Sequence, residues 1–168
     1  MRFDRLKKYT CIMASASSLC AVPGLANEDL VAAATSGVFT ANARLRYEGV
    51  DDDAFADSAD ALTLRTRLAY ETAPFYAFTL LGEGENVADV FDVDNYQLPA
   101  PPIPAATGNA VIADPQGTEL NRFQLRYRGI SKTDLILGRQ YLVYDNQRWI
   151  GNVGFRQNDQ TFDAFSAM

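Results

Sequence analysis

Hydrophobic and polar residues alternate with a period of two along much of the chain from Val38 onward. In Phe39–Glu48 the odd positions are mostly apolar and the even positions are mostly polar or charged. The segments Leu62–Glu71 and Arg122–Gly129 repeat this pattern, and Thr66 is the one polar residue on the apolar side of the former. Because successive side chains of a strand point to opposite faces, the pattern predicts strands with one polar and one apolar face.

Two further segments are less regular. Phe75–Glu85 alternates except at Leu81, which falls on the polar side, and Asp134–Tyr144 is partly apolar on both sides, so its phase is not fixed by the pattern. Another strand is predicted to begin near Thr161. Residues 27–168 carry no helical periodicity of any length, so we predict an all-β fold.

The first 26 residues have the layout of a secretory signal peptide. Four basic residues precede the weakly apolar stretch 11–22, and Gly24 and Ala26 supply small residues before a predicted cut at Asn27. The alternative, a buried N-terminal helix, is disfavoured because Pro23-Gly24 follows the apolar stretch directly. Both cysteines lie within this segment. Residues 27–37 are expected to form a periplasmic N-terminal segment.

Removal of the signal peptide changes the charge of the chain. The whole chain has a formal charge of −6, and loss of the four basic residues and one acidic residue in 1–26 leaves 11 basic and 20 acidic residues, a charge of −9. An acidic chain repels the phosphate backbone, so we expect no nucleic-acid partner.

An antiparallel transmembrane β-barrel explains the pattern better than a soluble β-sandwich, whose strands also alternate. The predicted strands are long enough to cross a bilayer, which takes about 9–11 residues, and aromatic residues lie near their ends. Long links (51–61, 87–118 and the segment after 145) alternate with tight links (73–74 and 130–133). Barrels of the outer membrane have long external loops and short periplasmic turns.

Six segments of the chain, taken together and in order, resemble the alginate-export porin family: 62–72, 114–121, 125–129, 137–140, 145–151 and 155–163. The resemblance implies a monomeric barrel of many strands with an arginine-lined, electropositive lumen, in a family whose founding member passes alginate across the outer membrane. Members are far longer than 168 residues. Residues 38–168 are therefore expected to form only the first five to six strands of a larger barrel, because closure needs about eight strands at least.

The sequence offers little for catalysis. It contains no histidine, and it has no nucleophile elbow, phosphate loop or dinucleotide fingerprint, so we expect neither an enzyme nor a bound cofactor. The acidic clusters at 51–53 and 89–94 lack the spacing of a calcium loop and are interpreted as solvated loop charge rather than a metal site.

Arginines are the main functional signal. They fall on the polar side of the regular strands, where lipid exposure would cost about 2–4 kcal/mol each near the bilayer midplane, so they are expected to face the lumen. A planar guanidinium pairs bidentately with carboxylates, which favours anionic solutes. The predicted lumen set is Arg44, Arg46, Arg65, Arg67, Arg122, Arg126 and Arg128, with Arg139 added from the strand of unfixed phase; Arg148, Trp149 and Arg156 are candidates for a constriction loop.

These residues leave three functions open. The first is an outer-membrane channel for anionic solutes, such as sugar acids or anionic carbohydrate including alginate. The second is a general porin, in which the arginines are paired with Glu48, Glu71, Glu83 and Glu85. The third is an adhesin or anchor barrel without a transport role. In each case we expect export to the outer membrane of a Gram-negative cell, contact with outer-membrane lipid and lipopolysaccharide, and insertion by the barrel-assembly machinery.

Overall fold

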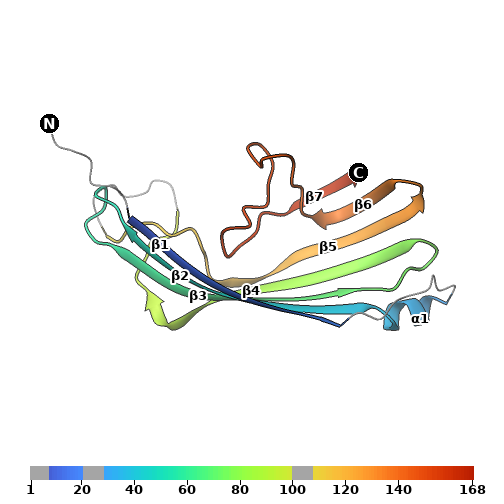
Figure 1. Ribbon diagram of the computed structural model, residues 1–168, viewed down its shortest axis with the longest axis horizontal. Helices are drawn as coiled ribbons and strands as arrows, with labels where there is room; N and C mark the ends of the chain where they lie inside the picture. Colours follow the sequence, from blue (N-terminus) through green and yellow to red (C-terminus); the bar gives the residue numbers. More distant parts are fainter. Residues whose placement is uncertain (1–7, 21–28, 100–107) are drawn as a thin grey trace.

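The chain forms a single seven-stranded antiparallel sheet in which each strand pairs with its neighbours in sequence (Figure 1). The computed structural model describes residues 8–20, 29–99 and 108–168. The all-β prediction is confirmed, and the six strands after residue 37 match the expected five strands and the beginning of a sixth. The elements are β1 (Lys8–Cys20), α1 (Leu30–Thr35), β2 (Val38–Asp51), β3 (Ala59–Glu71), β4 (Phe78–Asp94), β5 (Gly117–Ile130), β6 (Thr133–Gln140) and β7 (Phe162–Ala167).

Several strand boundaries differ from the prediction; β5, for example, begins at Gly117 rather than Arg122. β4 continues to Asp94, although a long loop was expected from Val87, because its pairing with β3 extends through Arg65↔Val87 and Thr63↔Asp89. β6 ends at Gln140, four residues before the predicted Tyr144. The short helix α1 was not expected; the Asp29 side chain caps it by accepting hydrogen bonds from two backbone N–H groups of its first turn.

Strand β1 falls within the segment that the sequence assigns to a signal peptide. It pairs with β2 over its full length, from Lys8↔Asp51 to Cys20↔Phe39, and so satisfies the backbone N–H and C=O groups along that edge. This pairing does not report on cleavage, and the signal peptide stays a prediction.

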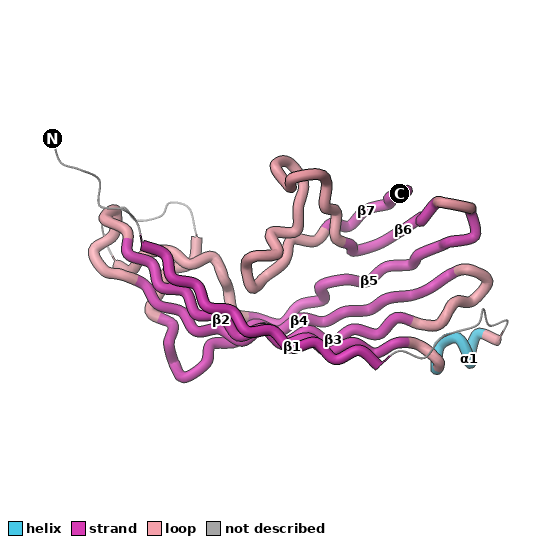
Figure 2. The backbone as a smooth tube through the Cα atoms, in the orientation of Figure 1, coloured by secondary structure: helices cyan, strands magenta, loops and turns pink. Residues whose placement is uncertain are grey.

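From β2 onward, successive connections lie at alternate ends of the sheet (Figure 2). Residues 72–77 and 131–132 connect strands at one end, the short-turn end, and 52–58, 95–116 and 141–161 connect them at the other. The links 95–116 and 141–161 are long, as predicted, but 52–58 is nearly as short as 72–77, so the predicted contrast in length holds only in part. Helix α1 packs at the short-turn end, where the Ala73 N–H donates to the Ala33 carbonyl at 3.0 Å and the Tyr70 hydroxyl donates to the Ala34 carbonyl at 2.8 Å. Within the described residues, no helix has the length and hydropathy of a membrane-spanning helix.

The two faces of the sheet show an unusual division of exposed and buried residues. Large apolar side chains are exposed on one face, here called the outer face: Leu68 is 50%, Phe123 51% and Leu137 58% exposed. Charged side chains are covered on the other, inner face, where Glu85 is 1% and Arg46 4% exposed. This is the opposite of the usual arrangement in water-soluble domains, where large apolar side chains are mostly buried and charged side chains are mostly exposed.

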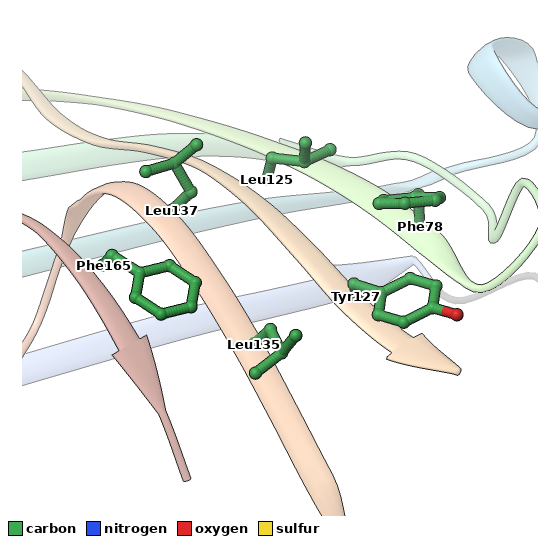
Figure 3. A pocket seen from close by; sticks show the side chains of 6 residues that line it. All are labelled: Phe78, Leu125, Tyr127, Leu135, Leu137 and Phe165. Atoms are coloured by element: carbon green, nitrogen blue, oxygen red, sulfur yellow. The ribbon is translucent and has the colours of Figure 1, made fainter. Parts of the chain in front are cut away.

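The outer face carries a shallow apolar hollow. Figure 3 shows the hollow across β4 to β7, lined by Phe78, Leu125, Tyr127, Leu135, Leu137 and Phe165.

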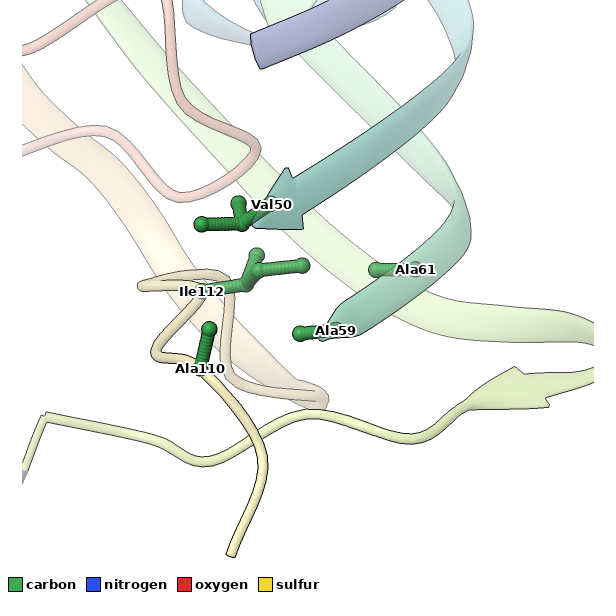
Figure 4. Packing of buried hydrophobic residues seen from close by; sticks show 5 residues of the cluster. All are labelled: Val50, Ala59, Ala61, Ala110 and Ile112. Atoms are coloured by element: carbon green, nitrogen blue, oxygen red, sulfur yellow. The ribbon is translucent and has the colours of Figure 1, made fainter. Parts of the chain in front are cut away.

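A small apolar core lies at the end of the sheet with the longer links, where segment 110–112 packs on the ends of β2 and β3 (Figure 4). It consists of Val50, Ala59, Ala61, Ala110 and Ile112, and it holds the β4–β5 loop against the sheet.

Candidate functional site

The inner face of β2 to β5 brings basic and acidic side chains together in rows. Strand register sets these rows, because residues directly opposite on neighbouring strands share a face. Arg67 lies opposite Glu85, and Glu83 lies opposite Arg122. The predicted arginines of the regular strands are therefore placed on one face, as expected, but acidic residues alternate with them.

Most of the inner arginines are engaged with carboxylates. Arg122 binds Glu83 bidentately, with Nε–Oε1 and Nη2–Oε2 distances of 3.0 and 2.6 Å. Arg46 Nη2 lies 2.6 Å from Glu48 Oε2, and the same arginine pairs with Asp114 of the β4–β5 loop. Arg67 pairs with Glu85 and, at 2.6 Å, with Asp159 of the β6–β7 loop. Paired guanidinium groups attract a passing anion much less than free ones do.

The β6–β7 loop, residues 141–161, lies within the concave side of the sheet, over the inner face (Figure 1). Gln157 is fully buried there, and its side-chain amide donates to the carbonyl of Thr63 at 2.9 Å and to Thr63 Oγ1 at 2.7 Å. Arg44 donates to Gln157 Oε1 and to the Gly154 carbonyl, both at 2.9 Å. The loop is therefore bound to the strands by buried hydrogen bonds.

The predicted constriction residues divide into two groups. Arg156 reaches the inner face, where its Nη1 lies 2.9 Å from Glu48 Oε2. Arg148 is exposed, and Trp149 is 92% exposed, so neither side chain is buried against the strands. The residues that hold the loop in place, Gln157 and Asp159, were missed, because nothing in the sequence distinguishes them from other polar loop residues.

Arg126 and Arg128 lie near the short-turn end, in a more open setting. Arg126 Nη1 is 3.8 Å from Glu71 Oε1, and Arg128 Nε is 3.3 Å from Asp134 Oδ1. Arg139 was expected on the same face, and this placement is wrong. It lies opposite Phe123 and Asp163 on the outer face and binds Asp163 bidentately at 2.9 and 3.0 Å.

Arg44 and Arg65 form the exception to the paired pattern. They lie directly opposite each other on β2 and β3, and both are buried. Within the described residues Arg44 has no carboxylate within salt-bridge distance, and Arg65 reaches only Asp159, at 3.9 Å. Positive charge is therefore in local excess at this pair.

Tyr141, the residue that follows β6, contacts the charged side chains of the inner face. Its hydroxyl donates to Glu83 Oε1 at 3.3 Å and accepts from Asn121 Nδ2 at 2.6 Å, while the Arg122 guanidinium lies 4.8 Å from the ring centroid. Burial, followed by the negative charge of Glu83, raises the pKa of Tyr141. The phenol therefore stays a neutral hydrogen-bond donor at physiological pH.

Across the described part of the chain, His, Cys, Asp and Glu side chains form no cluster suited to a metal ion.

Comparison with protein-family models, curated proteins and solved structures gives no match for this chain. The resemblance to alginate-export porins stays a prediction from the sequence.

Proposed function

We propose that this chain forms part of the wall of an outer-membrane β-barrel, whose inner face lines a water-filled channel for anionic solutes. The observation that carries the proposal is the division of the two faces: leucine and phenylalanine side chains are exposed while glutamate and arginine side chains are covered. Exposed apolar rows are unfavourable in water but match the lipid-facing surface of a barrel, and the polar face then lines the lumen.

Strand length and connections support the same assignment. Strands β2 to β5 contain 13 to 17 residues, which exceeds the about 9–11 residues that a tilted strand needs to cross a bilayer. The shorter turns lie at one end, as on the periplasmic side of such barrels. An open sheet edge is not stable in lipid, so in this proposal further strands of a longer protein complete the barrel.

The preference for anions comes from a local site rather than from a ladder of free arginines. Arg44 and Arg65 carry the excess positive charge, close to the loop that narrows the lumen. Both guanidinium groups lie beneath the loop, so they attract a sugar acid or an anionic carbohydrate such as alginate through the electric field of the lumen rather than by direct pairing. An attraction of this kind stays weak enough for the solute to leave, as conduction requires.

A general porin without charge preference is the second candidate, and a specific observation favours it. Each of the four glutamates Glu48, Glu71, Glu83 and Glu85 lies within salt-bridge distance of an arginine. Facing rows of both signs leave little net charge in the lumen.

Reversal potentials of the complete barrel in a salt gradient distinguish the candidates. Arg44→Gln combined with Arg65→Gln should lower the anion-over-cation permeability ratio about fivefold, if each charge contributes about 0.5 kcal/mol after screening. The matched control, Arg122→Gln with Glu83→Gln, removes one charge of each sign and should leave the ratio unchanged. A non-selective wild type that neither variant alters supports the general porin, and a barrel that never conducts supports the adhesin or anchor.

A further inference from the structure

We propose that Arg44 and Arg65 hold a small inorganic anion, such as chloride, beneath the β6–β7 loop, and that this ion helps to fasten the loop to the inner face. The site depends on the contacts of these two residues, so it stands whether or not the barrel conducts.

The first argument is the placement of two like charges. Arg44 and Arg65 are directly opposite on neighbouring strands, so their side chains leave the sheet side by side on the same face. They are 7% and 6% exposed, which leaves little water to screen their repulsion. Buried charges of one sign are stable only with a counter-charge close by.

The second argument is the set of hydrogen bonds that the two guanidinium groups make. Arg44 donates to two neutral acceptors, and Arg65 donates at 3.3 Å to Asn42 Oδ1 and at 3.4 Å to the Gln157 carbonyl. Arg44 Nη2 and Arg65 Nε are buried and lack a hydrogen-bond partner among the described residues. Buried donors without acceptors are costly, and one anion between them would satisfy both.

The third argument concerns the size of the ligand and its effect on the loop. The nearest carboxylate, Asp159, directs its Oδ2 to Arg67 at 2.6 Å, and its buried Oδ1 lies 3.9 Å from Arg65 Nη1, too far for a hydrogen bond. Gly154 and Gln157 of the loop contact Arg44 from above, so a ligand that binds while the loop is seated is a monatomic ion rather than a sugar acid. The ion offsets one of the two positive charges and reduces their repulsion, so both arginines keep the loop acceptors they bind.

Anomalous diffraction from crystals grown in sodium bromide locates the site directly. We expect a bromide peak within hydrogen-bond distance of Arg44 Nη2 and Arg65 Nε. The peak should vanish in Arg44→Gln and persist in Arg128→Gln, which removes an arginine of the same face that lies away from the loop. A water molecule or the Asp159 carboxylate at this position in the wild type would overturn the proposal.

Trypsin reports the effect on the loop in solution, because the loop contains two arginines in different settings. Arg156 is bound to Glu48, whereas Arg148 is exposed and serves as an internal control. At constant ionic strength, replacing methanesulfonate with chloride should slow cleavage after Arg156 about threefold when chloride is at twice its Kd, and should leave Arg148 unaffected.

Variants show whether that chloride effect comes from the pair. Arg44→Gln should abolish the chloride effect. Arg44→Lys keeps the positive charge and should retain part of the effect, and it serves as the test if Arg44→Gln fails to fold. Equal cleavage rates in the two salts, or an undiminished chloride effect in Arg44→Gln, would contradict the proposal.

Discussion

Gln157 donates two hydrogen bonds to Thr63, one to its carbonyl at 2.9 Å and one to its hydroxyl at 2.7 Å, although 94 residues separate them in the chain. The same residue accepts from Arg44, and its backbone N–H donates to Asp114 Oδ1 at 3.0 Å. One buried loop residue therefore joins β2, β3 and the β4–β5 loop. The β6–β7 loop is therefore anchored at this residue to three separate parts of the chain.

Replacing Gln157 with alanine should release the loop without unfolding the sheet. Buried hydrogen bonds to Thr63 and Arg44 are lost, and leaving their partners unsatisfied costs about 1–3 kcal/mol. Trypsin cleavage after Arg156 should then rise about tenfold or more, because cleavage follows the population of the open loop. Gln160→Ala is the matched control, since Gln160 is exposed and lies three residues further on. If both variants are cleaved like the wild type, Gln157 does not hold the loop.

The outer face should tolerate a charge only near its rim. Leu125 and Leu120 both lie on the outer face of β5, but Leu125 is near the middle of the strand and Leu120 is close to its start. In a bilayer, Leu125→Arg should destabilise the folded barrel by about 2–4 kcal/mol and Leu120→Arg by about 1 kcal/mol or less. Folding titrations into lipid vesicles measure this difference. Equal effects of the two substitutions would show that depth in a membrane is not what distinguishes them.

The strands and their faces follow from the sequence because a strand repeats every two residues. Arg44, Arg65 and Arg126 were assigned to one face on that basis, and the register confirms the assignment. Arg139 was misplaced because β6 is apolar on both sides: Ile136 is buried on the inner face, and Leu137 is exposed on the outer face. The pattern in β6 contains no signal that fixes its phase.

The pairing of the arginines could be predicted only in part. The four strand glutamates share the polar side of the alternation, so their pairing with arginines was one of the alternatives. Asp114 and Asp159 are on long loops, where no periodicity relates them to a strand position. Their contacts with Arg46 and Arg67 depend on how the loops fold back, which the sequence pattern does not encode.

Breaking one buried ion pair should cost far more than breaking an exposed one. Arg122→Gln leaves the Glu83 carboxylate buried without its bidentate partner, and we expect a loss of about 3–5 kcal/mol in the free energy of unfolding. Arg128→Gln affects a pair with Asp134 whose side chains are 53% and 37% exposed, and it should cost less than about 1 kcal/mol. Adding Glu83→Gln to Arg122→Gln should restore most of the stability. Denaturant unfolding of the four proteins checks this, and a double variant as unstable as Arg122→Gln would contradict it.

The mature protein should contain no thiol, because the predicted cut before Asn27 removes both Cys11 and Cys20. In the structure Cys11 belongs to β1, is exposed and accepts a hydrogen bond from Arg46 Nε at 3.3 Å, so a retained β1 would present a reactive cysteine. Maleimide labelling of the protein from outer membranes, combined with mass spectrometry of its N-terminus, distinguishes the two cases. We expect an unlabelled chain that begins at or near Asn27, and a labelled precursor when Ala26→Leu blocks the cut. Loss of β1 frees the backbone groups along β2, so in the proposed barrel another strand must pair with that edge. A labelled mature protein that retains residues 8–20 would instead show that β1 is a permanent strand of the sheet and that the signal-peptide prediction is wrong.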